Sequence, residues 1–83
     1  MDSVTIQGIK LHVGDRVYID GAAPFKSAVY ALTFIHPVKK DYVTIRRSPR
    51  PGVLCRDGYG QSLSFFKDKV LRRMPRGVQL VEF

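Results

Sequence analysis

Short runs in which apolar and polar residues alternate are the feature of this sequence that most restricts its fold. Residues 9–13, IKLHV, put Ile9, Leu11 and Val13 on one side, and residues 16–20, RVYID, repeat the pattern. A period of two is typical of a β-strand with one buried face. Glycine, proline and aspartate separate the runs, which indicates turns between short strands. The sequence therefore predicts an all-β chain.

Further runs extend this prediction. We expect strands at residues 4–6, 28–36 and 42–46. Residues 28–36 carry apolar side chains on both faces, as expected of a strand that bends and touches the core from either side. SLSFF at 62–66 alternates again, and VQLVEF at 78–83 is predicted to be the last strand.

One segment has a helical pattern. In KDKVLRRM at 67–74, Val70, Leu71 and Met74 stand at positions i, i+1 and i+4, which fits one short helical turn near residues 67–73. Five to six strands with this single turn predict a small antiparallel barrel, closed or half closed.

The size of the chain and its one cysteine set further bounds. The 83 residues predict one domain, 1–83, with a small core, and this leaves homo-oligomerisation open. Because Cys55 has no second cysteine to pair with, we expect a cytoplasmic or nuclear protein rather than a secreted one. No run approaches the roughly 18 apolar residues that span a bilayer, so no membrane partner is expected.

The charge is unevenly distributed along the chain. The formal net charge is +7, and residues 1–36 are balanced, so residues 37–83 carry the whole excess. A concentrated positive field favours a polyanionic partner, and nucleic acid, DNA or RNA, is the first candidate. The alternative is that lysine and arginine only keep a small protein soluble.

The expected phosphate-binding cations lie in the loops and strand ends of the second half. Arginine matches phosphate oxygens with two hydrogen bonds, and each phosphate contact releases counterions. Residues 48–61, SPRPGVLCRDGYGQ, are hypothesised to be a mobile basic loop that orders on the ligand. Tyr18 and Tyr42 fit either base stacking or cross-strand packing, and Tyr59 is expected to be the most available for a base. The predicted binding residues are Lys39, Lys40, Arg46, Arg47, Arg50, Arg56, Tyr59, Lys67, Lys69, Arg72 and Arg73.

Neither a catalytic nor a metal site is predicted. A nucleophile needs an adjacent base and an orienting group, and the spacing of His12, His36 and Cys55 indicates none. The same residues do not supply the clustered ligands of a structural zinc. Arg56 beside Cys55 would favour a reactive thiolate, whereas Val53 and Leu54 favour a small buried thiol. We expect a binding module with no enzyme activity and no cofactor.

Two motifs resemble a known fold. GDRVYI at 14–19, followed by a loop and two long strands, and SLSFFKDKVLRR at 62–73 resemble the SH3-like small barrel of Tudor, KOW, retroviral integrase C-terminal and bromo-adjacent homology domains. VTIQGIKLHVGDRVYI at 4–19 is most similar to the start of bromo-adjacent homology domains, which bind chromatin. Those domains are longer than this chain, so the resemblance implies their core barrel alone.

A second resemblance is to plasmid-type dihydrofolate reductases, which are small barrels active as tetramers. It rests on residues 14–17, on residues 21–23 and on the apolar rhythm of residues 62–71. At the positions of that family's Val-Gln-Ile-Tyr pore motif this chain has Leu63, Ser64, Phe65 and Phe66. The resemblance therefore implies the fold without the reductase activity.

Two functions besides nucleic-acid binding stay open at this stage. The first is a protein-interaction module, such as a small phage-type or plasmid-type inhibitor or a chromatin-reader-like barrel, that binds an acidic protein surface. The second is an oligomeric enzyme with a site on a symmetry axis.

Overall fold

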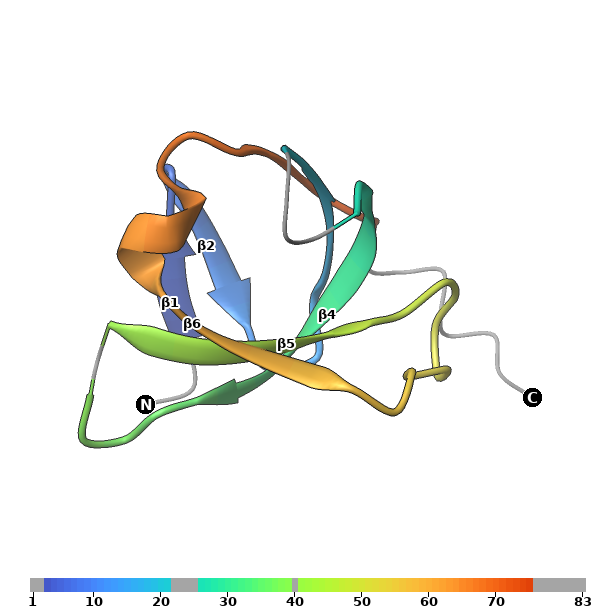
Figure 1. Cartoon of the computed structure of the whole chain (residues 1–83), viewed down its shortest axis with the longest axis horizontal. Helices are drawn as coiled ribbons and strands as arrows, with labels where there is room; N and C mark the ends of the chain where they lie inside the picture. The colour runs from blue at the N-terminus through green and yellow to red at the C-terminus, as the bar shows by residue number, and fades with distance from the viewer. Residues whose placement is uncertain (1–2, 22–25, 40, 76–83) are drawn as a thin grey trace.

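A computed structural model describes residues 3–21, 26–39 and 41–75. Within these residues the chain forms seven strands and one short 3-10 helix (Figure 1). The elements are β1 (Ser3–Ile6), β2 (Ile9–His12), β3 (Arg16–Asp20), β4 (Ala28–Ile35), β5 (Tyr42–Arg47), β6 (Gly58–Ser62), η1 (Leu63–Phe66) and β7 (Val70–Arg73). The all-β prediction is confirmed, and the strands predicted in the first 47 residues are β1 to β5.

The strands form two antiparallel sheets. β1 and β2 make a two-stranded hairpin, and the other five strands make a sheet of order β6-β5-β4-β3-β7. The hairpin turns at Gln7 and Gly8, whose φ angles are 54° and 78°. Positive φ at both central residues is the requirement of a type I′ turn, which matches the twist of the strands that it joins.

A single core lies between these sheets. Ile6 and Leu11 of the hairpin belong to the same buried cluster as Leu32 and Ile45 of the five-stranded sheet. Phe66 of η1 completes the cluster and is 1% exposed. The hairpin is also joined to the segment after η1, because the Gln7 Nε2 donates to the carbonyl oxygens of Phe66 (2.7 Å) and Lys69 (2.5 Å).

The predicted helical turn near residues 67–73 is wrong, and so is the predicted strand at 62–66. Leu63, Phe65 and Phe66 all pack on the core, which a strand's alternation does not allow but a 3-10 turn does. Residues 70–73 instead form strand β7, in which Leu71 is buried opposite Ile19 and its neighbours are exposed.

The number of strands also differs from the five or six expected. Strand β6 was not predicted because Gly58 and Gly60 argue against a strand. The structure explains them: a Cβ on Gly60 would lie 3.0 Å from the Tyr42 ring, and a Cβ on Gly58 would lie 3.2 Å from Thr44. Side chains of β5 thus lie across β6, and a larger residue at either position would have to displace them. Residues 53–56 form no strand.

The five-stranded sheet is not closed into a barrel, so the predicted small barrel is not confirmed. β6 and β7 are the edge strands of the larger sheet, and no ladder joins them within the described residues. The predicted strand at 78–83 lies outside those residues. Among the helices of the described ranges, none has the length and apolar character needed to cross a membrane.

Candidate nucleic-acid interface

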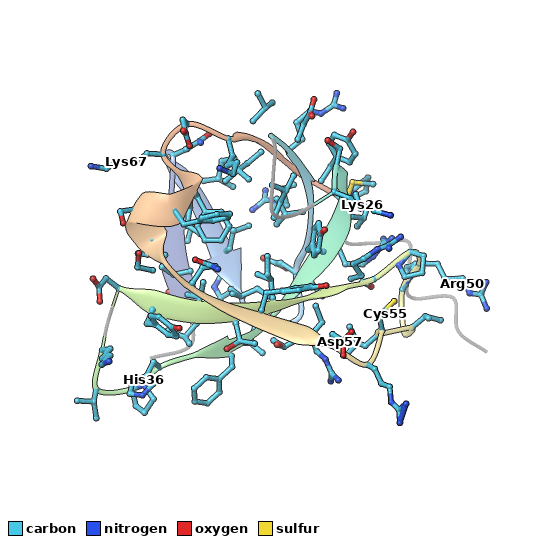
Figure 2. All side chains as sticks on the ribbon, viewed as in Figure 1. Lys26, His36, Arg50, Cys55, Asp57 and Lys67 are labelled. Atoms are coloured by element: carbon cyan, nitrogen blue, oxygen red, sulfur yellow. The ribbon has the colours of Figure 1, made fainter. Side chains whose placement is uncertain are left out.

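The predicted cations do not form one surface. Four of them, Arg46, Arg47, Arg50 and Arg56, lie in or beside the connection from β5 to β6. Figure 2 shows Arg50 and Lys67 at opposite ends of the longest dimension of the molecule. The structure therefore brings together the arginines of the β5–β6 connection and separates them from Lys67.

The other predicted cations have separate positions. Lys39 lies in the turn before β5, Arg72 and Arg73 lie on β7, and Lys40 lies outside the described residues. The Lys69 side chain is only 10% exposed, with Nζ 4.2 Å from the centre of the Phe65 ring.

The two arginines of β7 contact the protein itself. The Arg72 guanidinium lies 5.4 Å from the centre of the Tyr18 ring, and the Arg73 Nη1 donates to the Lys10 carbonyl oxygen at 3.1 Å. These contacts hold both side chains near the protein surface.

Residues 47–57, here called the arginine loop, are held by backbone hydrogen bonds. The Ser48 amide donates to the Val29 carbonyl oxygen at 2.9 Å, and the Cys55 amide donates to the Arg47 carbonyl oxygen at 2.8 Å. Ser48 is 1% exposed, and its carbonyl oxygen accepts from the Arg16 Nη2 at 3.2 Å. The loop is therefore tied to strands β3 and β4.

A tight turn gives the arginine loop its shape. The Val53 amide donates to the Arg50 carbonyl oxygen at 3.1 Å, with Pro51 and Gly52 between them and φ of +82° at Gly52. Proline followed by a residue of positive φ is the sequence that a type II turn requires. The sequence predicts a loop that orders on its ligand. In the structure the loop follows a course defined by these backbone hydrogen bonds.

The charges of the loop face solvent without a carboxylate partner. Arg47, Arg50 and Arg56 are exposed, and the only Lys or Arg ion pair within the described ranges is Lys69 with Asp68, at 3.4 Å. Asp57 lies in the same loop and is exposed, so the loop keeps an excess of positive charge.

Arg46 differs from the other three arginines. It is half-buried on β5, its stem lies against Gly58, and its Nη2 donates to the carbonyl oxygen of Arg56. It therefore joins the end of the loop to the sheet, so its replacement would disturb the loop as well as remove a charge.

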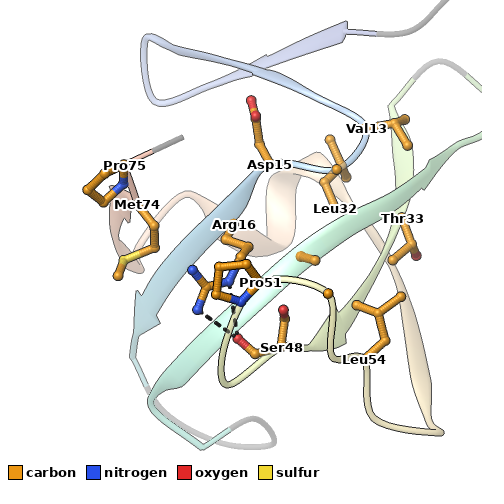
Figure 3. A pocket seen from close by; sticks show the side chains of 13 residues that line it. Val13, Asp15, Arg16, Leu32, Thr33, Ser48, Pro51, Leu54, Met74 and Pro75 are labelled. Carbon is orange, nitrogen blue, oxygen red and sulfur yellow. Dashed lines mark hydrogen bonds between the residues drawn. The ribbon is translucent and has the colours of Figure 1, made fainter. Parts of the chain in front are cut away.

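An open groove runs beside the arginine loop (Figure 3). Its volume is about 610 Å³. Ser48, Pro51 and Leu54 form the side that belongs to the loop, and the Arg16 guanidinium lies in the groove with its hydrogen bonds to Ser48. The remaining lining residues are Val13, Gly14, Asp15, Ala31, Leu32, Thr33, Gly52, Met74 and Pro75.

The aromatic residues are placed differently from the prediction. Tyr59, expected to be the most available, packs against the core opposite Ile45, with its ring 6.4 Å from that of Tyr30. Burial raises the pKa of the Tyr30 phenol above its ordinary value. Tyr42 is half-buried on the sheet face opposite the core, here called the outer face.

Sequence reasoning missed Phe34. Its side chain is 49% exposed and lies on the outer face opposite Thr44. The register between β4 and β5 shifts between Leu32 and Phe34, and this bulge turns Phe34 outward while Leu32 stays in the core. Alternation alone assigns both residues to one face, so no feature of the sequence indicates the exposed ring.

The two histidines contact neighbouring protein groups, and the cysteine is partly buried. The His36 Nδ1 accepts hydrogen bonds from the amides of Val38 (3.1 Å) and Lys39 (2.8 Å). His12 lies 3.8 Å from the Asp15 carboxylate. Cys55 is a free, half-buried thiol. No three His, Cys, Asp or Glu side chains in the described part of the chain are grouped to hold a metal ion.

Comparisons of the chain with models of known protein families, with curated proteins and with solved structures found no match.

Proposed function

We propose that this chain is a non-enzymatic module that binds nucleic acid through the arginine loop. The observation that carries the proposal is the loop itself: Arg47, Arg50 and Arg56 are exposed on one hydrogen-bonded segment and have no ion pair within the described ranges. Guanidinium groups match phosphate oxygens with two hydrogen bonds, and a loop backbone that is already hydrogen-bonded loses little freedom on binding.

We also infer that the fold is a partly open SH3-like barrel and that the protein works in the cytoplasm or nucleus. The five-stranded antiparallel sheet and the 3-10 turn just before β7 support the first inference. The single cysteine supports the second, because a secreted protein of this size is commonly stabilised by disulfides.

The test removes three loop charges and compares them with three charges elsewhere. Arg47, Arg50 and Arg56 are replaced by alanine in one variant, and the exposed Lys10, Lys26 and Lys67 in the other. Both variants lose the same net charge, so long-range attraction falls equally. Each phosphate contact on a single strand contributes about 0.7 to the slope of log K against log salt concentration, so the arginine variant should lose about 2 units of slope.

Binding is measured by fluorescence anisotropy of a labelled oligonucleotide over a series of salt concentrations. The lysine variant should keep most of the slope and of the affinity. Equal losses in the two variants would show that only net charge matters and would overturn the proposal.

A second candidate function is supported by the groove beside the loop. A groove of about 610 Å³ that is lined by both apolar and polar residues and lies next to exposed arginines also suits an acidic peptide segment. Binding of that kind depends less on counterion release, so it should survive high salt. Polyglutamate that displaces the oligonucleotide at equal charge concentration would favour this second function.

A further inference from the structure

The outer face of strands β4, β5 and β6 carries an aromatic surface, here called the aromatic strip. It consists of Phe34, Tyr42, Thr44 and Gly60, which the strand register places together: Phe34 lies opposite Thr44, and Thr44 lies opposite Gly60. Phe34 is 49% exposed. A phenyl ring this exposed on a sheet adds nothing to the core and is available to a ligand.

β6 places no side chain opposite Thr44, because position 60 is glycine. The Oη and Cε2 atoms of Tyr42 lie 3.0 Å from the position that a Cβ of Gly60 would occupy. The Tyr42 ring therefore lies over the backbone of β6. A flat base can approach such a surface, whereas a larger residue at position 60 would displace the ring.

The His36 imidazole makes edge-to-face contacts with both aromatic rings of the strip. Its imidazole centre is 6.2 Å from that of Phe34 and 6.4 Å from that of Tyr42, at interplanar angles of 86° and 88°. The two amide hydrogen bonds to Nδ1, from Val38 and Lys39, fix the orientation of the imidazole. The aromatic groups thus have defined positions, which reduces the entropy that a stacked ligand would cost.

Cations lie at both ends of the strip. The Lys39 Nζ is 5.8 Å from the centre of the Tyr42 ring. Arg46 is four positions after Tyr42 on the same face of β5, and at the rise of a strand the two residues are about 13 Å apart. Beyond Arg46 the arginine loop continues the positive surface, since Arg46 donates to the Arg56 carbonyl oxygen. Asp41 and Asp57 are exposed near the two ends and form no ion pair with these cations.

From this arrangement we infer that the aromatic strip stacks unpaired bases, so that the ligand of the arginine loop is single-stranded nucleic acid rather than a duplex. The inference rests on the proposed function, because the loop supplies the phosphate contacts. Bases in a duplex are stacked on each other and present only their edges, whereas a single strand presents its base faces to aromatic side chains. Phosphate contacts alone would not discriminate in this way.

The test uses an oligothymidylate and a duplex of equal length, both labelled, at one salt concentration. The probe variant is Phe34→Leu with Tyr42→Leu, which keeps apolar volume and removes both aromatic faces. The control is Val70→Ala, which alters a residue that is 58% exposed on β7, at the sheet edge opposite β6. Thermal unfolding of each variant verifies that it is folded.

The native protein should bind the single strand more tightly than the duplex. The probe variant should lose about tenfold or more in affinity for the single strand, from the range measured for single base-stacking contacts, and should keep its duplex affinity. The control should lose neither.

Equal affinity of the native protein for both ligands, with no loss in the probe variant, would overturn this inference. The proposed function would survive that result if the arginine variant still bound both ligands more weakly. If the arginine variant bound like the native protein, the proposed function would fail instead.

Discussion

Replacement of Gly52 by alanine tests whether the arginine loop is already formed before a ligand binds. Gly52 has φ of +82° at the third position of the type II turn, and a Cβ there would meet nothing within 4 Å. The effect is therefore conformational and not steric. An L-residue in this region costs roughly 1–2 kcal/mol, and the reduced freedom of the unfolded chain offsets up to about 1 kcal/mol. We expect a net loss of about 1 kcal/mol in the free energy of unfolding.

The measurement is equilibrium urea denaturation, read as a change in midpoint at constant m-value. Gly8→Ala is the matched control, because Gly8 has φ of +78° in the β1–β2 turn and also has open space around it. Gly52→Asn should lose less than Gly52→Ala, because asparagine tolerates positive φ. If Gly8→Ala loses stability and Gly52→Ala does not, the loop is not held in its turn and the reasoning is refuted.

Two further predictions concern the core and the hairpin. Burial raises the pKa of Tyr30 above its ordinary value of 10.0, so the contribution of this phenol to stability is complete below about pH 10 and is lost as pH rises through the folded-state pKa. Urea titrations at alkaline pH should therefore show that Tyr30→Phe loses less stability with rising pH than the native protein does. An equal loss of stability in the two proteins would contradict this prediction. At neutral pH the same variant should lose about 1 kcal/mol with the hydrogen bond to the Lys26 carbonyl oxygen. Gln7→Gly relieves the strain of the positive φ at this position but removes two hydrogen bonds to the η1–β7 segment. We expect a net loss of about 1 kcal/mol in the free energy of unfolding. A gain in stability would show that the two hydrogen bonds contribute little.

Alternation predicted the strands that have one face on the core. Leu11, Val17 and Ile45 are buried, and their neighbours Lys10, Arg16 and Arg46 are not, so the period of two was present in the sequence itself. The pattern failed at 62–73 because two adjacent phenylalanines, at 65 and 66, both pack on the core through a 3-10 turn. Neighbouring apolar residues fit a turn or a strand equally well, and only the packing of the whole chain decides between them.

The sequence indicates the positive charge of the candidate interface but not where on the fold it lies. Composition gives the positive charge, and the Pro51–Gly52 pair gives the turn. The contact of Arg46 with the end of the loop depends on the pairing of β5 with β6. This pairing was not predicted, because Gly58 and Gly60 argue against a strand. Phe34 faces outward because of a bulge, and bulges leave no periodic pattern. Of the eleven predicted residues, four therefore lie in or beside the arginine loop, and the other described ones lie elsewhere.

The central claim is that exposed arginines of a preformed loop bind phosphates, and the salt dependence of oligothymidylate binding by the native protein tests it most directly. Three phosphate contacts by Arg47, Arg50 and Arg56 predict that log K falls linearly with log salt concentration, with a slope of about −2 or steeper. A slope near zero, or no detectable binding at low salt, would contradict the account.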